Sequence, residues 1–337
     1  MSIMLTGFFV VDIIAYNLDR IPEPGEIVRT SYFHVSTGGH PLNIAIDLVK
    51  LGLKGSDIFV CGSMGNDLFS KSIVETLKNY GVKLCAKVVD NVYTSTTLII
   101  VEKGRDRRFI NYIGANAYLD LDHVIRCYNE IKPRYLFLAI GALGDFDNVA
   151  YKAIEKANKD NILTFLDFAL GQEEKIPYIL KAIKYSDIVH CNNLELRSIT
   201  GEKDIDKGAK ILLKNSNVKL LFITLGGEGV ILYTRNGLKI SQKSFNVEVV
   251  DPTGAGDAFD AGVLYMMYRN SINKNTLENL DIEKLIEILI FAQAVGATCV
   301  TMPGATTGVS KETVEKLLKH QYNDIRQNTR IEKFMIE

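Results

Sequence analysis

The sequence lacks several features that mark whole classes of protein. No apolar run approaches the length of about 18 residues that a membrane-spanning helix needs, so no such helix is predicted. The first basic residue is Arg20, and Asp12 interrupts the first apolar run, which is not typical of a secretory signal peptide. There is no Gly-Lys dipeptide and hence no Walker A loop, no G-x-G-x-x-G dinucleotide fingerprint and no G-x-S-x-G nucleophile elbow.

Charge of one sign is also lacking. Lys and Arg number 39 and Asp and Glu number 40, so the formal net charge of −1 gives no support for a nucleic-acid or membrane partner. Cysteine is sparse, and no C-x-x-C pair occurs, so we expect reduced, structural thiols in a cytoplasmic protein at Cys61, Cys85, Cys127, Cys191 and Cys299. The hydrophobic share of 47% excludes an intrinsically disordered chain.

Short β-rich apolar segments alternate with amphipathic segments along the chain. Segments rich in β-branched and aromatic residues predict strands at residues 5–11, 57–61, 135–140, 162–167, 188–191 and 220–224. Apolar residues at helical spacing predict helices at residues 41–51, 67–80, 121–131, 147–158, 177–184, 207–215, 256–268, 282–298 and 311–320. This alternation predicts an α/β fold, in which helices cover both faces of a mainly parallel sheet.

Two segments break the alternation. Residues 26–35 and 93–113 have the pattern of β-ribbon without an intervening helix, and the second contains threonine- and isoleucine-rich runs on either side of a Gly turn. Together they predict a small sheet that projects from the main domain. After about residue 322 the chain is polar, and we expect this tail to be loosely held.

The segment DPTGAGDAFDAG, which begins at Asp251, carries the most chemical information. It follows a strand-like run at residues 245–250 and begins a helix. The small residues Gly254–Gly256 allow successive backbone N–H groups to converge at a helix N-terminus, which favours an anion. Asp257 lies directly beside them, and phosphoryl transfer requires this combination of charge stabilisation and a base. Alternatively, Asp257 is only a cap of the helix.

Further segments place polar or small residues where predicted strands end or helices begin. Asp12 ends the first strand, STGGHPLN precedes the first helix, CNNLE follows a strand, and TLGGEG links two strand-like runs. Ligands of α/β proteins usually bind at the carboxyl ends of strands, where Asp12 and Asn43 suit a polyhydroxylated ligand. Asn192 and Glu195 suit a hydrated magnesium ion. Each segment also has a structural interpretation, as a strand end, a turn or a helix cap.

Taken together, these motifs resemble the ribokinase family of sugar kinases, also called the phosphofructokinase-B family. DPTGAGDAFDAG is similar to the C-terminal signature of the family and STGGHPLNIAIDLVKLG to its N-terminal one, while CNNLE and TLGGEG match its N-x-x-E and nucleotide-loop elements in order. The resemblance covers residues 7–309. It implies one ribokinase-like domain over residues 1–337, with a three-layer α/β/α core and a β-sheet lid formed by about residues 12–36 and 93–113.

The resemblance also implies an activity and a set of site residues. The γ-phosphoryl group of ATP would move to a hydroxyl of a small sugar or polyol, with Asp257 as the base and Mg²⁺ held through water by Glu195. A monovalent cation such as K⁺ would lie at Asp251 and Thr253, and the lids of two copies would pair in a homodimer. The remaining implied residues are Gly254, Ala255 and Gly256 for the anion hole, Asp12, Gly38, Gly39 and Asn43 for the acceptor, and Asn192, Glu195, Thr224, Gly226, Gly229, Ala292 and Gly304 for ATP.

Departures from particular subfamilies leave the acceptor open. His40 stands where ribokinases carry Lys in G-G-K-G-x-N, and Asp167 lacks the following Asn and Arg of D-x-N-x-R, which disfavours an acidic sugar. The leading hypothesis is a cytoplasmic kinase for a small neutral sugar or polyol. One alternative is a nucleoside kinase, in which Phe109 would be a substrate-binding residue of the lid. Another is a catalytically silent sugar-binding module.

Overall fold

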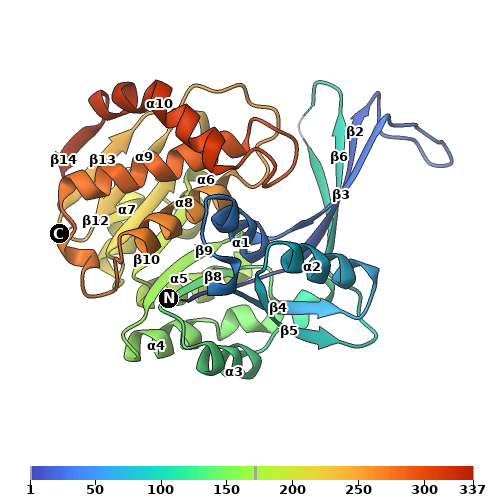
Figure 1. Ribbon diagram of the computed structural model, residues 1–337, viewed down its shortest axis with the longest axis horizontal. Helices are drawn as coiled ribbons and strands as arrows, with labels where there is room; N and C mark the ends of the chain where they lie inside the picture. The colour runs from blue at the N-terminus through green and yellow to red at the C-terminus, as the bar shows by residue number, and fades with distance from the viewer. Residues whose placement is uncertain (1, 106, 171–172, 337) are drawn as a thin grey trace.

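A ten-stranded sheet runs through the middle of the molecule (Figure 1). The computed structural model describes residues 2–105, 107–170 and 173–336. The strand order is β14-β13-β12-β11-β10-β9-β8-β1-β4-β5. Neighbouring strands from β11 to β5 are parallel, whereas β12, β13 and β14 pair antiparallel. The strands are β1 (Ile3–Thr6), β4 (Ile58–Gly65), β5 (Lys83–Val89), β8 (Tyr135–Ile140), β9 (Leu163–Phe168), β10 (Ile188–Asn192), β11 (Leu220–Thr224), β12 (Val230–Thr234), β13 (Leu238–Gln242) and β14 (Arg330–Lys333).

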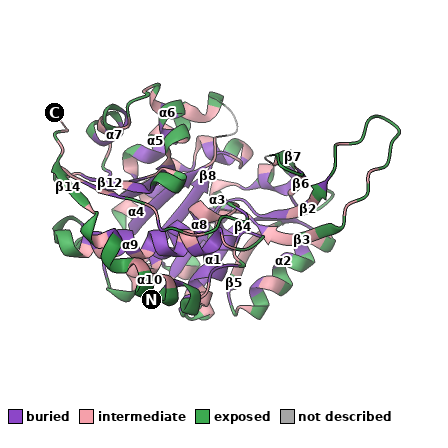
Figure 2. Cartoon of the chain, turned by 90° about the horizontal axis from the view of Figure 1, so that it is seen from above, coloured by how far each residue is buried: buried purple, intermediate pink, exposed green. Residues whose placement is uncertain are grey.

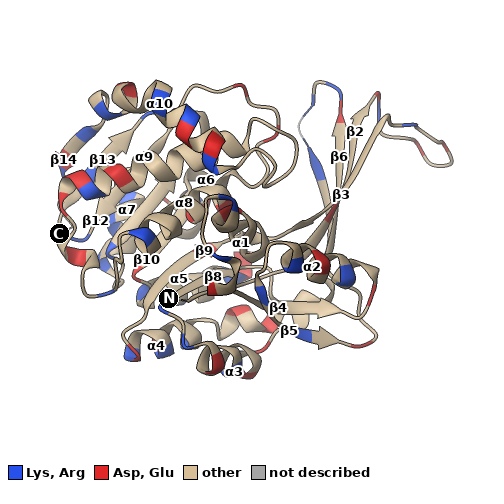
Figure 3. Cartoon of the chain, in the orientation of Figure 1, with Lys and Arg blue, Asp and Glu red and all other residues tan. Residues whose placement is uncertain are grey.

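Helices cover the sheet in two groups. On one side α1 packs on α8, α8 on α9 and α9 on α10, and α5, α6 and α7 lie on the opposite side (Figures 1 and 2). The helices are α1 (His40–Lys50), α2 (Leu68–Asn79), α3 (Leu121–Ile131), α4 (Tyr151–Lys159), α5 (Ile176–Tyr185), α6 (Asn193–Thr200), α7 (Ile205–Lys214), α8 (Ala255–Arg269), α9 (Ile282–Cys299) and α10 (Lys311–Gln327). Within the described ranges no helix combines the length and apolar character that a bilayer crossing requires. Acidic and basic residues are interspersed along the helices (Figure 3).

The order of the strands reverses at the centre of the sheet. From β1 the chain passes through α1 to β4 and through α2 to β5, on one side of β1. From β8 it builds the sheet in the opposite direction: α4 leads to β9, α5 leads to β10, and α6 with α7 leads to β11. The topological switch point therefore lies between β1 and β8. Ligands of open α/β sheets bind outside the carboxyl ends of the strands at such a point.

A second, four-stranded sheet has the order β3-β2-β6-β7. Its strands are β2 (Val10–Leu18), β3 (Tyr32–Gly38), β6 (Thr96–Glu102) and β7 (Arg108–Tyr112). The small sheet predicted from the sequence is thus present, although the strand predicted at residues 26–35 begins only at Tyr32 and continues to Gly38. Residue 106 of the predicted ribbon lies outside the described residues.

The central strands are buried over their whole length. All six residues of β8 and all six of β9 are buried, because helices cover both faces of a parallel sheet (Figure 2). Most of these side chains are apolar. Asp167, near the end of β9, is a buried carboxyl group in this setting, and such a group needs a compensating partner.

Three further sequence predictions about secondary structure are wrong. Residues 5–11 are not one strand, because β1 ends at Thr6 and β2 begins at Val10, so Asp12 lies inside β2 rather than at the end of the first strand. Residues 245–250 are not a strand, because the chain leaves the sheet after β13 and Val249 and Val250 become exposed. The backbone N–H of Val250 instead donates to Val300 O over 2.8 Å. The tail is not loose, because α10 continues to Gln327 and β14 then pairs with β13. This pairing satisfies the backbone groups that β13 would otherwise expose at an edge.

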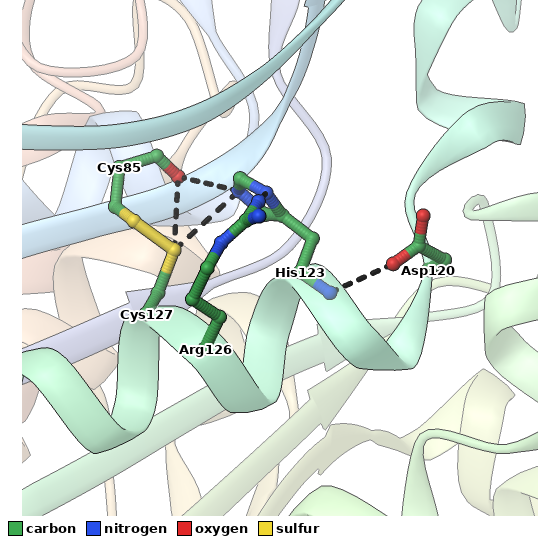
Figure 4. The surroundings of a disulfide bond; sticks show 5 residues. All are labelled: Cys85, Asp120, His123, Arg126 and Cys127. Carbon is green, nitrogen blue, oxygen red and sulfur yellow. Dashed lines mark hydrogen bonds between the residues drawn. A yellow bond between two sulfur atoms is a disulfide. The ribbon is translucent and has the colours of Figure 1, made fainter.

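The expectation of reduced thiols is wrong for two of the five cysteines, whereas Cys61, Cys191 and Cys299 are free and buried as predicted. Cys85 on β5 and Cys127 on α3 form a disulfide bond, with Cα atoms 6.3 Å apart (Figure 4). Arg126 lies 2.8 Å from Nδ1 of His123 and can only donate, so Nδ1 accepts and Nε2 carries the proton, facing Cys85 O at 3.1 Å. Cys61 and Cys127 lie near His123, but both ring nitrogens of His123 are engaged and the sulfur of Cys127 is in the disulfide bond, so the three residues as they stand do not offer a metal site.

Candidate active site

The start of α8 has the shape of an anion-binding helix N-terminus. Gly254 is its N-cap residue with φ of 80°, in the left-handed region that favours glycine. A Cβ atom at Gly254 would lie 2.3 Å from Ala305 O, so no other residue fits without a shift of the chain. No side chain within the described residues caps α8. The first-turn N–H groups, those of Gly256 and Asp257 among them, therefore remain available to a ligand.

Asp257 is buried in the first turn of α8 and is held by α1. Nδ2 of Asn43 donates to Oδ2 of Asp257 over 2.7 Å. On the other side of the carboxyl group, Nε2 of His40 lies 3.7 Å from Oδ1. Burial raises the pKa of Asp257, whereas His40 and Asn43 act to lower it. Those two neighbours therefore favour the ionised carboxyl group, and burial opposes it.

A chain of charged groups continues behind Asp257. Oδ2 of Asp167 lies 3.7 Å from Nε2 of His40 and 3.4 Å from Nδ1 of His190. The same Nδ1 lies 2.9 Å from Oδ1 of Asp260, and Nε2 of His190 lies 3.1 Å from Oγ1 of Thr224. Burial acts to lower the pKa of His190, but Asp260 and Asp167 outweigh it and raise the pKa well above its usual value. This cluster pairs buried carboxyl groups with the buried imidazole of His190 and the half-buried imidazole of His40.

The predicted acceptor residues lie together on the other side of Asp257. Asp12 on β2 pairs with Ser36 on β3, and a Cβ atom at the neighbouring Gly38 would lie 2.3 Å from Oδ2 of Asp12. Burial raises the pKa of Asp12 to about 7, and the nearby charge of Asp257 adds to the rise. Gly39 has φ of 93° and no room for a Cβ atom, which would lie 2.1 Å from Phe8 O. Glycine at both positions leaves room for the carboxyl group of Asp12 and for the backbone of Phe8.

The CNNLE segment forms a helix cap. Oδ1 of Asn192 accepts from the N–H groups of Leu194 and Glu195, and Oε2 of Glu195 accepts from the N–H of Asn192 over 2.8 Å. The structural interpretation of this motif is therefore correct, and the carboxyl group of Glu195 is still available to other ligands through its second oxygen. Burial, followed by the charge of Asp167, raises the pKa of Glu195 to about 7.

The two residues predicted to hold a monovalent cation are engaged by the chain itself. Arg107, from the turn of the β6–β7 hairpin, places its guanidinium 3.4 Å from Oδ1 of Asp251 and in a hydrogen bond with Oγ1 of Thr253. Tyr16 of β2 donates to Oδ2 of Asp251 over 2.7 Å, and the N–H of Gly304 donates to the same oxygen over 3.0 Å. Burial opposes ionisation of Asp251, but the hydrogen bonds from Thr253 and Gly304 prevail and lower its pKa.

Other predicted residues lie in varied surroundings. Phe109 is 56% exposed on β7, and its ring lies 5.4 Å from the guanidinium of Arg107. Ala292 is fully buried in α9, where it packs against Gly262 of α8. Gly226 and Gly229 form the tight turn between β11 and β12, both with positive φ. Their roles toward a nucleotide remain predictions.

Sequence reasoning missed several charged residues that meet at this edge of the sheet. It noted Asp167 and His40 only as departures from family motifs and regarded His190 as structural. The available signal was a charged or ionisable side chain inside an apolar, buried strand, as at Asp167 and His190. For Arg107 the sequence carried no signal, because the contact joins segments 144 positions apart.

Known proteins resemble this chain over most of its length. Residues 2–312 match the family model of the pfkB family carbohydrate kinases. "Fructokinase-1" of rice (Oryza sativa subsp. japonica) is 30% identical over 298 residues, which cover 85% of this chain and 90% of the relative.

Solved structures share the fold. Ribokinase from Giardia lamblia has a TM-score of 0.81 at 23% identity, covering 94% of this chain and 99% of the other. Arabidopsis thaliana ribokinase, solved in complex with ribose and ATP, has a TM-score of 0.75 at 26% identity, covering 94% and 98%. The fold is therefore ribokinase-like, with a large, mainly parallel sheet and a separate small one.

Proposed function

The chain belongs to the pfkB family of carbohydrate kinases and is an ATP-dependent sugar kinase, and we propose that Asp257 is its catalytic base. The observation that carries this proposal is the position of the Asp257 carboxyl group in the first turn of α8, beside the uncapped N–H groups that follow Gly254. Asp257 takes the proton of the acceptor hydroxyl, and the hydroxyl oxygen then bonds to the γ-phosphorus. The bond between the γ-phosphorus and the β–γ bridging oxygen breaks, and ADP leaves.

The remaining residues have roles that follow from their positions. The N–H groups at Gly254, Ala255 and Gly256 stabilise the negative charge on the transferred group. Asp12, with Asn43 and the glycines at 38 and 39, binds the acceptor, since carboxylate and amide groups suit sugar hydroxyls. ATP binds on the side of α6 and the β11–β12 turn.

Mg²⁺ is the cofactor that this reaction uses, and the residues at the start of α6 fit it. Glu195 has one carboxylate oxygen outside the capping bond to Asn192, in a largely buried position. A carboxylate acting through water suits a magnesium ion, which keeps most of its hydration shell. The ion supplies charge neutralisation at the phosphates.

The acceptor we favour is a small neutral sugar, a ketohexose or a pentose. The relatives carry the names fructokinase and ribokinase, and no Arg follows Asp167 to pair with an acidic sugar. The test is ADP release from ATP with a panel of fructose, ribose, other neutral sugars, polyols and nucleosides. Phosphorylation of a neutral sugar is expected, and turnover confined to nucleosides would overturn the choice of acceptor.

The small sheet, as the lid of a single domain, is also proposed to join two copies of the chain. β7 is an edge strand, and all five of its residues are exposed, including Phe109, Ile110 and Tyr112. An exposed apolar edge strand is a natural site for pairing with a second copy.

We place the enzyme in the cytoplasm, where ATP is supplied. The Cys85–Cys127 disulfide is unusual for such a compartment.

A further inference from the structure

His40 lies between two carboxyl groups of the site. Its Nε2 lies 3.7 Å from Oδ1 of Asp257 and 3.7 Å from Oδ2 of Asp167, so one imidazole faces two carboxyl groups from two different elements. His40 is the first residue of α1, directly after Gly39, and its ring packs edge-on against Phe8 with centroids 4.7 Å apart. The ring is therefore held in place by the backbone and by packing.

The surroundings of Asp257 are otherwise mainly acidic. Asp167 faces it from β9, Asp12 from β2, Asp47 from α1 and Cys299 from the end of α9, and behind Asp167 lies Asp260 of α8 itself. Among the described residues, the cationic groups that most lower its pKa are His40 and, from β10, the more distant His190, while Lys50 of α1 acts on Asp47 and Cys299. Of the two imidazoles, His40 is within ion-pair distance of an Asp257 oxygen. His190 is paired with Asp260 and Asp167.

We propose that His40 is a positioning residue, whose imidazole ring orients the Asp257 carboxyl group and favours its ionised form for proton removal from the acceptor hydroxyl. Asn43 fixes Oδ2 by a hydrogen bond, and His40 fixes Oδ1 by charge. A base that is desolvated beside other carboxyl groups needs such a counter-charge, because burial and like charges favour its protonated, inactive form. This inference rests on the proposed function, since it concerns the base of the proposed reaction.

The first test is the pH profile of kcat for His40→Gln and His40→Lys. Gln cannot carry a positive charge, so the acid limb should move upward by about one pH unit, giving up to about tenfold loss on that limb that fades as pH rises above it, with little change in KM for the sugar. Lys keeps a positive charge and should restore the limb. His320→Gln, on the exposed face of α10, is the matched control and should match the wild type.

Other outcomes would overturn the inference. A raised KM with an unmoved acid limb would mean that His40 contacts the sugar rather than acting through Asp257. A loss that is equal at every pH, and that Lys does not restore, would mean that His40 only supports the fold.

The second test does not depend on turnover. Carboxyl ¹³C resonances are titrated in the wild type and in His40→Gln, and the Asp257 resonance is identified as the one missing in Asp257→Asn. The pKa of Asp257 should rise by about one unit when His40 is replaced. An unmoved pKa overturns the inference, whereas a failure of the wild type to phosphorylate any sugar would overturn the proposed function and leave this result readable.

Discussion

Asn43 of α1 donates a hydrogen bond of 2.7 Å to Asp257 of α8, across 214 positions of the sequence. The bond joins the helix that follows the small sheet to the helix that begins at the anion-binding turn. It fixes one oxygen of the carboxyl group and leaves the residue in the first turn of α8, where negative charge is also stabilised by the helix dipole. The two sequence motifs on either side of this bond therefore form one site.

Replacement of Asp257 by Asn tests its role as base. Asn keeps the shape of the side chain but cannot accept the hydroxyl proton, so kcat should fall by about 10²–10⁴-fold. Asp122→Asn is the matched control, because Asp122 is an exposed carboxylate in the first turn of another helix, α3, and should leave turnover unchanged. Turnover of Asp257→Asn near the wild-type value would contradict the assignment.

Arg107→Ala tests how the site at Asp251 and Thr253 is neutralised. With the guanidinium present, these oxygens already have a positive partner. We expect turnover in K⁺, relative to tetramethylammonium at equal ionic strength, to be stimulated at least about threefold more in Arg107→Ala than in the wild type, because K⁺ then supplies the missing charge. Arg105→Ala, on the same hairpin, is the control. An equal response to K⁺ in Arg107→Ala, in Arg105→Ala and in the wild type would contradict this prediction.

Reduction of the disulfide should lower stability without touching the site. The bond between Cys85 and Cys127 closes a loop of 42 residues, for which the chain-entropy relation gives about 3–4 kcal/mol. Urea unfolding with and without a phosphine reductant should show this loss in the wild type. The same reductant should not change the stability of Cys85→Ala, and an insensitive wild type would show that the bond does not form.

Asp47→Asn should stabilise the fold at alkaline pH. Both carboxylate oxygens of Asp47 lack a hydrogen-bond partner among the described residues, and burial, partly offset by Lys50, raises its pKa well above the usual value. At pH values between the pKa of Asp47 in the unfolded state and its pKa in the folded state, the folded state binds more protons than the unfolded state. The free energy of unfolding therefore falls as pH rises through this range. Asn cannot ionise, so the variant should gain about 1–2 kcal/mol near pH 8 and little near pH 3.

Urea unfolding at the two pH values measures this effect. Asp90→Asn, at an exposed position, is the control and should show no difference between them. A gain of equal size at both pH values would mean that the effect of Asp47→Asn comes from packing rather than from ionisation.

Ile110→Lys tests pairing through the small sheet. Ile110 is 63% exposed at the centre of the edge strand β7, where a charge would face its counterpart in the second copy. Sedimentation of the wild type should show a dimer. The dissociation constant of the Ile110→Lys dimer should be about tenfold higher than that of the wild type, or higher still. Leu68→Lys, an exposed apolar position on α2, should leave the dimer intact. A wild type that stays monomeric at every concentration would rule the pairing out.

The sequence alone determined the features that depend on neighbouring residues. Alternating strand and helix patterns predicted the α/β fold, because each element's period follows from its own backbone geometry. The turn before α8 was predicted for the same reason, since glycine is the residue that most readily adopts the positive φ found at Gly254. Residues 245–250 show the limit of this reasoning: their composition suits a strand, but β13 already has its two partners, and the segment lies outside the sheet.

Only the tertiary structure decided which distant groups meet. His40 reaches Asp167 and Asp257 because α1, β9 and α8 converge at the switch point of the sheet. Arg107 reaches Asp251, and Cys85 reaches Cys127, for similar reasons of packing. Such pairs leave no trace in local pattern, because the ion pairs and the covalent S–S bond join segments that the sequence separates by 42 to 217 positions.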